Sequence, residues 1–350
     1  MIQEILKEAV EQKVSDIFLV AGRPVSFYKN GVITKEGVVM LTPDEVEEDV
    51  REIYEMANRD YSRLTDGGDD DFSLSVAGLS RFRVSAYKQR GTASAVLRVI
   101  SFTLPNPTDF SIPENIVNLG NQPNGMVLVT GPAGSGKSST LACIIDHINK
   151  TRESHVITLE DPIEYLHRHD QSIVSQREIG VDTKSYVAGL RAALRQCPHV
   201  ILLGEMRDFE TISVAMTAAE TGHLLLSTLH TMGASNTINR IIDVFPANQQ
   251  RQITVQLSSV LHAVVSQQLL PTLSGGVVPA FEIMTMTPAI RNMIRDGKVH
   301  QIDGVIYSSP DKSMISMDES ISKLLNDGII SRETAERYAV HPERLRERKA

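Results

Sequence analysis

The chain has 350 residues, of which 41% are hydrophobic and 22% are charged, as expected of a globular protein long enough for two domains. Its net charge of −8, from 35 basic and 43 acidic residues, excludes a broad basic surface for nucleic acid, although a local basic stripe stays open. No apolar run approaches the roughly 18 residues that span a bilayer. Residues 1–4 lack the character of a signal peptide, and two cysteines in predicted core or near-core segments, Cys143 and Cys197, suit a reducing compartment. We therefore expect a cytoplasmic protein.

The first forty-odd residues predict a mixture of helices and short strands. An amphipathic helix opens the chain, because apolar residues recur on one face at 3.6-residue spacing. Short strands are expected at 16–20 and 25–29, on either side of a Gly-Arg-Pro turn. Residues 42–45 form a capping box with proline at the first helical position, and a second helix with a buried stripe follows. The apolar positions of the first helix are Ile2, Ile5, Leu6, Ala9 and Val10.

An acidic, glycine-rich run at 66–71 interrupts this pattern. It is most simply a solvated turn, with metal binding as the second hypothesis. Two strand-like runs come next, at 81–87 and 93–100, joined at Arg90-Gly91. These elements predict a small α+β domain over residues 1–103.

A proline-rich segment at 104–113 marks the expected domain boundary. Its three prolines in ten residues predict a stiff, extended linker. Beyond about residue 124, strands and helices alternate, which indicates a parallel-rich α/β sheet in a second domain over 114–350. Its last part, about 285–350, is expected to be helical. Amphipathic stretches with capping residues lie there at 289–296, 318–327 and 331–339.

Residues 131–138 read Gly-Pro-Ala-Gly-Ser-Gly-Lys-Ser, a G-x-x-x-x-G-K-[ST] phosphate-binding loop. An apolar strand-like run precedes it and a helical pattern follows, which disfavours the alternative of an ordinary glycine turn. Backbone N–H groups of such a loop point at phosphate oxygens, Lys137 reaches the β- and γ-phosphates, and Ser138 holds Mg²⁺. The predicted phosphate-binding residues are Gly131, Pro132, Ala133, Gly134, Ser135, Gly136, Lys137, Ser138 and Ser139.

Three later apolar runs also end in polar clusters, at 160–164, 204–205 and 227–230. In an open parallel sheet the carboxyl ends of the strands face the ligand, so we expect these clusters beside the phosphates. Hydrolysis needs one carboxylate to orient or deprotonate water and another to support Mg²⁺. Glu160 and Glu205 are the candidates for these two roles. A helix N-cap is the alternative for any single acidic residue after a strand.

Two histidines, His223 and His230, flank the last of these runs. They are candidates for nucleotide contacts, with sensing of the γ-phosphate as the hypothesis. Core histidines or zinc ligands are the alternatives. Zinc is disfavoured because no cysteine or third histidine stands at ligand spacing.

The motifs together resemble the secretion ATPase superfamily and, within it, the type IV pilus retraction ATPases, the PilT family. The phosphate loop corresponds to Walker A, ITLEDPIEY at 157–165 to the Asp box, and ILLGEMRD at 201–208 to an atypical Walker B. TGHLLLSTLHT at 221–231 is similar to the His box, and AIRNMIRD at 289–296 to a motif of retraction enzymes. The segments SDIFL and RFRVS correspond as well, so the resemblance covers nearly the whole chain.

This resemblance implies a homohexamer with a PAS-like N-terminal domain and a RecA-like ATPase domain. ATP or ADP and Mg²⁺ would bind between the two domains. It further implies a motor at the cytoplasmic face of the inner membrane, peripheral to the bilayer, that powers pilus retraction through a membrane platform protein. The resemblance carries over Arg81, Arg83 and Arg98 as arginine fingers, with Arg83 and Arg98 preferred, while surface arginines on strands are the alternative.

The strand ends and the phosphate loop assign the hydrolytic roles, and the resemblance assigns a role to the two arginines of the motif at 289–296. Glu160 would be the general base, and Ser138 and Glu205 would support Mg²⁺. Arg291 and Arg295, in the motif at 289–296, would serve mechanical coupling more than hydrolysis. Simple packing of that amphipathic helix is the alternative.

The chain departs from the family pattern before Walker B, where residues 197–199 read Cys-Pro-His in place of Asp-Pro-Asp. We expect an active enzyme, although the loss of two acids near the site would alter turnover and keeps a non-hydrolysing ring subunit as an alternative. An assembly or type II secretion ATPase is a nearer rival. Its usual four-cysteine zinc module is missing from this chain. A nucleic-acid motor is disfavoured by the acidic balance.

Overall fold

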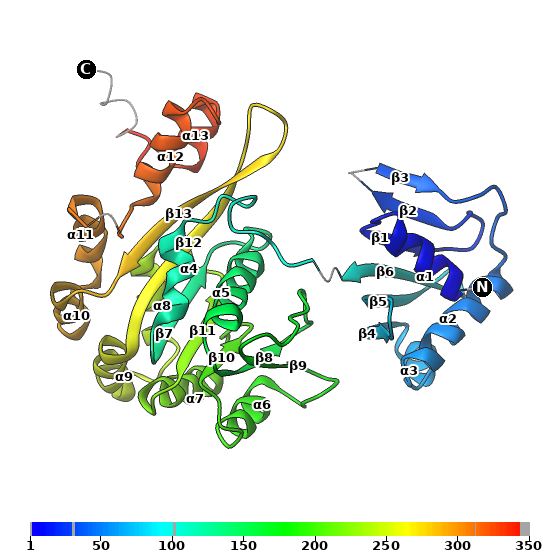
Figure 1. Cartoon of the computed structure of the whole chain (residues 1–350), viewed down its shortest axis with the longest axis horizontal. Coiled ribbons are helices and arrows are strands. Elements are labelled where there is room, and N and C mark those ends of the chain that lie inside the picture. Colours follow the sequence, from blue (N-terminus) through cyan, green and yellow to red (C-terminus); the bar gives the residue numbers. More distant parts are fainter. Residues whose placement is uncertain (1, 30–31, 101–102, 312, 344–350) are drawn as a thin grey trace. The chain divides into compact units, whose positions relative to one another are not determined.

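The computed structural model describes residues 2–29, 32–100, 103–311 and 313–343. The chain forms two units, one of the residues up to Thr103 together with Glu164–Leu166 and one of the remaining residues, and each has its own hydrophobic core (Figure 1). Within these residues no helix is both long and apolar enough to cross a bilayer.

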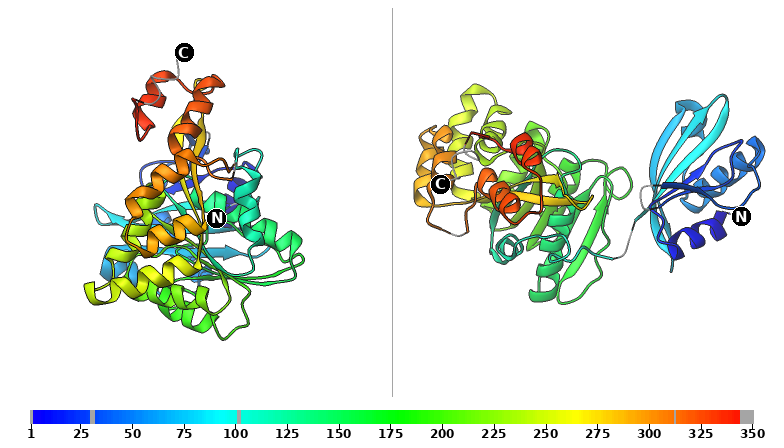
Figure 2. Two further views of the ribbon diagram at one scale, coloured as in Figure 1. Left: turned by 90° about the vertical axis from the view of Figure 1, so that its left-hand side faces the viewer. Right: turned by 90° about the horizontal axis from the view of Figure 1, so that it is seen from above.

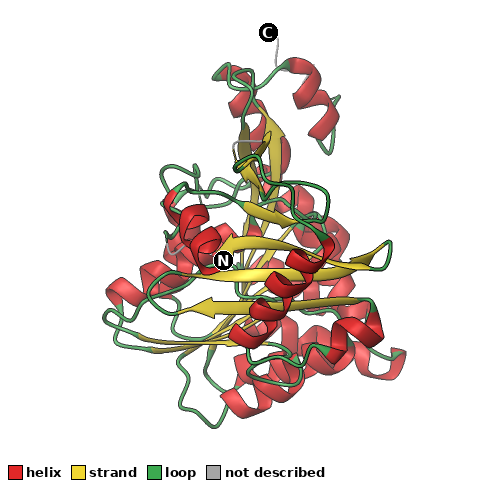
Figure 3. Ribbon diagram, turned by 90° about the vertical axis from the view of Figure 1, so that its right-hand side faces the viewer, coloured by secondary structure: helices red, strands yellow, loops and turns green. Residues whose placement is uncertain are grey.

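The first unit is a six-stranded antiparallel sheet in the order β3-β2-β1-β6-β5-β4. Its helices lie across one face of the sheet, as Figure 3 shows, and bury the apolar side chains of alternate strand positions. The strands are β1 (Asp16–Leu19), β2 (Ser26–Lys29), β3 (Val32–Lys35), β4 (Asp69–Val76), β5 (Ser80–Gln89) and β6 (Thr92–Ile100). The helices are α1 (Ile2–Glu11), α2 (Pro43–Met56) and α3 (Ser62–Gly67).

Local sequence signals account for much of this unit. The capping box at the start of α2 is confirmed, because Thr42 Oγ1 accepts a hydrogen bond from Glu45 N and Glu45 Oε2 accepts one from Thr42 N. The tight turn between β5 and β6 has left-handed backbone at Arg90 (φ 50°) and Gly91 (φ 82°), as a hairpin of this kind requires.

The acidic run at 66–71 is only partly the solvated turn that we expected. Its second half begins β4, and the Asp70 side chain is only 10% exposed there rather than open to solvent. Arg59 Nη2 lies 2.6 Å from Asp70 Oδ1, and Tyr54 Oη donates to Asp70 Oδ2 at 2.9 Å. The Arg59 guanidinium neutralises the charge of the largely buried Asp70 carboxylate. Through these two contacts, Asp70 connects α2 and the segment after it to the sheet.

The second unit contains a seven-stranded sheet in the order β13-β12-β7-β11-β10-β8-β9. All neighbours in it are parallel except β12 and β13. Helices cover both faces, with α5 (Lys137–Thr151) over one core and α7 (Phe209–Glu220), α8 (Ala234–Asp243) and α9 (Ala247–Val260) over the other. The strands are β7 (Gly125–Thr130), β8 (His155–Glu160), β9 (Ile173–Glu178), β10 (Val200–Leu203), β11 (Leu224–Leu229), β12 (Leu261–Pro271) and β13 (Val277–Thr285).

The last helices of the chain pack on the long antiparallel hairpin of β12 and β13 (Figure 2). The three amphipathic stretches predicted near the C-terminus correspond to α10, α12 and α13, each begun by a Thr or Ser N-cap. The helices of the unit are α4 (Glu114–Val117), η1 (Asn118–Asn121), α5 (Lys137–Thr151), α6 (Tyr186–Ala193), α7 (Phe209–Glu220), α8 (Ala234–Asp243), α9 (Ala247–Val260), α10 (Pro288–Arg295), η2 (Val299–Gln301), α11 (Ile302–Ser308), α12 (Met317–Asn326) and α13 (Arg332–Tyr338).

The proline-rich segment at 104–113 does not run as a simple extended linker. Ile112 is buried in the core beneath α5, and Cys143 Sγ donates to the Pro105 carbonyl at 3.2 Å. The backbone also turns, since Ile112 N donates to Pro107 O. The segment therefore packs on the second unit as part of its surface.

Candidate nucleotide site

The phosphate loop connects β7 to α5, and two of its glycines are required by packing. Gly131 has φ 139°, and a Cβ there would lie 2.2 Å from the Gln267 carbonyl oxygen. Gly136, the N-cap of α5, has φ 87°, and its Cβ would lie 2.8 Å from Gln267 Nε2. The loop is thus pressed against β12, where Thr140 Oγ1 also donates to Gln267 Oε1 at 2.7 Å.

The loop has the donors that a triphosphate needs. Lys137 Nζ donates to the carbonyl oxygens of Gly131 and Pro132, at 2.9 and 2.8 Å, so its ammonium lies within the loop. Ser135 Oγ is buried and has no hydrogen-bond partner among the described residues. A buried hydroxyl without a partner fits a loop that receives ligand oxygens.

Glu160, Glu205 and His230 lie where neighbouring parallel strands end, on the same side of the sheet as the phosphate loop. We call this side the carboxyl edge, and the side where the parallel strands begin the amino edge. The strand order β7-β11-β10-β8 and the parallel registers place the carboxyl ends of all four strands together. Glu160 ends β8, Glu205 follows β10, and His230 follows β11. This common edge is the arrangement expected from the sequence.

Glu205 is held by two neighbours. Arg207 Nε lies 2.6 Å from Glu205 Oε2, and His230 Nε2 lies 3.4 Å from the same oxygen. Tyr186 adjoins the site, and burial, followed by the nearby carboxylates of Glu205, Asp161 and Glu160, raises the pKa of its phenol. A cavity of about 280 Å³ opens here, lined in part by Tyr186, Glu205 and Arg207.

The Glu160 carboxylate accepts two hydrogen bonds on one of its oxygens. Thr158 Oγ1 donates to Glu160 Oε1 at 2.5 Å, and Gln176 Nε2 donates to the same oxygen at 3.2 Å. Glu160 is half-buried at the end of its strand.

A metal ion would need ligands from outside the protein. Among the described residues, no three His, Cys, Asp or Glu side chains lie close enough to hold a metal ion. Mg²⁺ characteristically takes one or two protein oxygens and completes its shell with waters and substrate phosphates. Ser138 at the start of α5 and Glu205 fit that pattern of ligation.

The two candidate histidines do not lie together. His223 precedes β11 and His230 follows it, so they lie at opposite edges of the sheet, roughly 20 Å apart for a strand of this length. The His223 ring contacts Thr221 Oγ1 and the Ala218 carbonyl. Within one chain, therefore, His230 lies at the carboxyl edge with the phosphate loop, and His223 lies at the amino edge.

The Cys-Pro-His departure lies at that same distant edge. Residues 197–199 precede β10, where His199 Nδ1 accepts a hydrogen bond from His155 N. Contrary to our expectation, the substitution removes no acid from the carboxyl edge. Cys197 is exposed, with φ 51° in the loop after α6, so the expectation that it lies in or near the core was wrong.

The three N-terminal arginines share one face of the first unit's sheet. Arg81 and Arg83 alternate with buried Phe82 and Val84 along β5, and Arg83 pairs in register with Arg98. Arg83 is exposed, and Arg98 is 64% exposed although its Nε lies 2.9 Å from Asp16 Oδ1. These guanidinium groups lie on the face opposite the helices, where an anion can approach them.

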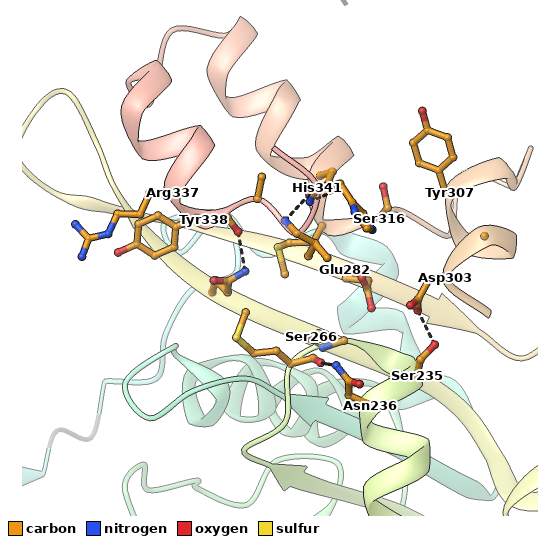
Figure 4. A pocket seen from close by; sticks show the side chains of 18 residues that line it. Ser235, Asn236, Ser266, Glu282, Asp303, Tyr307, Ser316, Arg337, Tyr338 and His341 are labelled. Carbon is orange, nitrogen blue, oxygen red and sulfur yellow. Dashed lines mark hydrogen bonds between the residues drawn. The ribbon is translucent and has the colours of Figure 1, made fainter. Parts of the chain in front are cut away.

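A larger cavity, of about 630 Å³, lies farther along the second unit between α8, β12, β13 and the last helices (Figure 4). Its carboxylates serve to join segments. Glu282 Oε1 accepts from Ala234 N at 2.8 Å, and burial raises the pKa of Glu282. Asp318 Oδ1 accepts from Val340 N at 2.7 Å, and Asp303 accepts from a serine hydroxyl of α8. The Asp303 contact connects α11 to α8, the helix that follows His230, and the Asp318 contact joins α12 to the segment after α13.

Sequence reasoning missed several neighbours of the site. Thr158 and Gln267 are polar residues in mainly apolar strands, and Gln176 lies in the polar second half of β9, but neither pattern identifies the partner of these side chains. Arg207 belongs to the Walker B segment, but the sequence did not predict its ion pair with Glu205. Their contacts depend on strand register, which the chain's pattern alone does not specify.

A β-strand, a glycine loop and a helix, with carboxylates at the neighbouring strand ends, define a P-loop nucleotide-binding protein. The model of the type II/IV secretion system protein family matches residues 1–316, and the chain belongs to this family.

Comparison with individual proteins shows which members of the family the chain resembles. The chain is 42% identical over 346 residues to the type IV pilus retraction ATPase PilT of Pseudomonas aeruginosa, covering 98% of this chain and 99% of that protein. It is 45% identical over 276 residues to a twitching motility protein of Neisseria gonorrhoeae, covering 79% of this chain and 74% of the other. A crystal structure of the pilus retraction motor PilT with bound ADP superposes with a TM-score of 0.91 at 43% identity, covering 98% of each chain. The chain is accordingly a secretion-type ATPase similar to PilT.

Proposed function

We propose that this protein hydrolyses ATP with Mg²⁺ as a homohexameric motor that powers type IV pilus retraction, and with it pilus disassembly and twitching motility. The observation that carries the proposal is the shared edge of the sheet, where the phosphate loop meets Glu160, Glu205 and His230. Similarity over nearly the full length to PilT supports the cellular role.

Each of these residues would have a separate role in the reaction. The backbone of 131–138 and Lys137 bind the phosphates, and Ser139 follows the loop at the start of α5. Water attacks the γ-phosphorus, the bond to the β–γ bridging oxygen breaks, and Glu160 accepts the proton from the water. Ser138 and Glu205 would hold Mg²⁺, which neutralises phosphate charge when it is bound. His230, whose Nε2 lies 3.4 Å from Glu205 Oε2, would contact the γ-phosphate.

Arg83 and Arg98, with Arg81 beside them, would complete the site from the first unit. Their charge would stabilise the γ-phosphate in the transition state, as arginine fingers do. In a homohexamer, repeated closing of such arginines on nucleotide would convert hydrolysis into domain motion. A platform protein at the cytoplasmic face of the inner membrane would receive that motion, with the motor peripheral to the bilayer.

Two experiments test the proposal. Purified Lys137→Ala should show no phosphate release above background, and undiminished turnover would refute the assignment of the loop. Deletion of the gene should give hyperpiliated cells that do not retract their pili. Cells without pili would instead indicate an assembly motor.

A further inference from the structure

One oxygen of the Glu160 carboxylate accepts hydrogen bonds from two neighbouring strands. Thr158 Oγ1, on β8, donates to Glu160 Oε1 at 2.5 Å, and Gln176 Nε2, on β9, donates to the same oxygen at 3.2 Å. Thr158 is fully buried and Gln176 is half-buried. Two donors on a single oxygen fix the plane of a carboxylate more tightly than either alone.

Strand geometry explains why these side chains meet. Side chains alternate along a strand, so Thr158 and Glu160 lie on the same face of β8. In the parallel register of β8 and β9, Thr158 pairs with Gln176. Gln176 therefore projects from the neighbouring strand on the face that bears the carboxylate.

A second contact orients the Gln176 amide. Its Oε1 accepts a hydrogen bond from the backbone N–H of His167 at 2.8 Å. Because that N–H is a donor, the amide oxygen must face it, and the NH₂ group is turned toward Glu160. Burial lowers the pKa of the His167 ring to about 4, so this ring is neutral near pH 7 and the anchor is the backbone.

We propose that Thr158 and Gln176 are positioning residues that hold the Glu160 carboxylate in the orientation from which it takes the proton of the attacking water. The inference rests on the proposed role of Glu160 as the base. A glutamate has three side-chain torsions, and a general base is effective only when its oxygen stays within hydrogen-bond reach of the proton. The two donors supply that constraint from rigid strands rather than from a loop.

The test compares matched substitutions in the purified full-length protein. Thr158→Val keeps the shape of the side chain and removes its hydroxyl, whereas Thr158→Ser keeps the hydroxyl. Gln176→Leu removes the amide. We expect Thr158→Val and Gln176→Leu each to lower kcat about 10- to 100-fold, as for the loss of one hydrogen bond to a charged group. KM for ATP and the unfolding midpoint should stay near the wild-type values, and Thr158→Ser should restore most of kcat.

A change confined to kcat, with rescue by serine, is not what a purely structural defect would produce. Wild-type kcat in both Thr158→Val and Gln176→Leu would overturn the proposal. Should leucine at 176 prevent folding, Gln176→Asn replaces it, because its shorter amide cannot bridge His167 N and Glu160 together. Wild-type kcat in that variant would count equally against the proposal.

Glu160→Ala separates this inference from the function on which it rests. If Glu160→Ala retains turnover, the proposed base is wrong. If Glu160→Ala is inactive while the Thr158 and Gln176 variants turn over normally, the base stands and its positioning by these residues fails. In the Glu160→Ala background, adding Thr158→Val and Gln176→Leu should cause no further loss, since positioning residues act through the group that they hold.

Discussion

Arg83 on β5 lies directly opposite Arg98 on β6, so two arginine side chains leave the same face of the sheet at paired positions of neighbouring antiparallel strands. Like charges in such a pair typically destabilise a sheet. Asp16 offsets part of the charge through its ion pair with Arg98. Arg83 has no ion pair within the described ranges of the chain. An arrangement that costs stability and exposes paired cations is reasonable where an anion is to be bound.

Replacing Arg83 should therefore separate stability from activity. Arg83→Gln removes the like-charge contact, so the unfolding midpoint should be unchanged or slightly raised. ATP hydrolysis should fall strongly, toward the roughly 10³-fold typical of a lost arginine finger. Thermal unfolding and phosphate release measure the two effects. Arg63→Gln, an exposed arginine of the same unit, is the control and should alter neither property.

Two glycines of the phosphate loop predict different outcomes for the same substitution. Gly131→Ala would bring a Cβ to within 2.2 Å of the Gln267 carbonyl oxygen, so the loop or β12 must move. Gly134 has φ 74° but no atom within 4 Å of a Cβ, so alanine there costs backbone strain of about 1 kcal/mol.

We expect Gly131→Ala to lose nucleotide binding, and Gly134→Ala to weaken it modestly. Binding of ADP by calorimetry checks both variants. Equal losses would show that backbone strain, rather than the contact with β12, decides the effect.

Elements with local signals could be predicted from the sequence, whereas contacts between distant segments could not. The helix at 43–56 and the hairpin turn at Arg90-Gly91 are encoded within a few residues. The hydrogen bond between Gln267 on β12 and Thr140 on α5 joins residues 127 positions apart, and it depends on sheet order. The position of His223 follows from the strand assignment alone, because a residue before β11 lies at the amino edge once the strand is known to be parallel.

Asp49 on α2 predicts a pH dependence of stability for the first unit. Its side chain is buried, and burial, reinforced by Glu52, Glu48 and Glu45, raises the pKa of Asp49 to about 6. Because this folded-state pKa lies above the unfolded value, stability that is present below about pH 4 is lost as the pH rises through about 6.

Asp49→Asn should therefore stabilise the unit at pH 7.5 by roughly 2 to 3 kcal/mol, at about 1.4 kcal/mol per unit of pKa displacement. The gain over the wild type should vanish near pH 4. Thermal unfolding at both pH values measures the difference. Glu48→Gln, which removes a charge from an exposed neighbour, should have a much smaller effect, and an equal gain from that variant would contradict burial as the cause.

The motif at 289–296 contains two arginines in different settings, and their substitution separates packing from mechanical coupling. Arg291 Nη1 donates to the carbonyl oxygens of Ser258 and Ser259, at 2.5 and 3.2 Å, and so caps the C-terminal end of α9. Arg295 is exposed, and no hydrogen bond or ion pair of its side chain is found among the residues that the structure describes.

Arg291→Ala should lower the unfolding midpoint by several degrees, since a charged donor to two carbonyls contributes about 1.5 to 3 kcal/mol. Its ATPase activity should nevertheless stay near the wild-type value, because α10 is not part of the phosphate edge, while retraction is lost. Arg295→Ala should retain both stability and hydrolysis. If Arg295→Ala also abolishes retraction, the exposed face of α10 transmits force by contact. If the Arg295→Ala variant retracts pili normally, the defect of Arg291→Ala comes from the lost hydrogen bonds between α10 and α9. Comparable losses of hydrolysis and retraction in Arg291→Ala would exclude a separate coupling role for this helix.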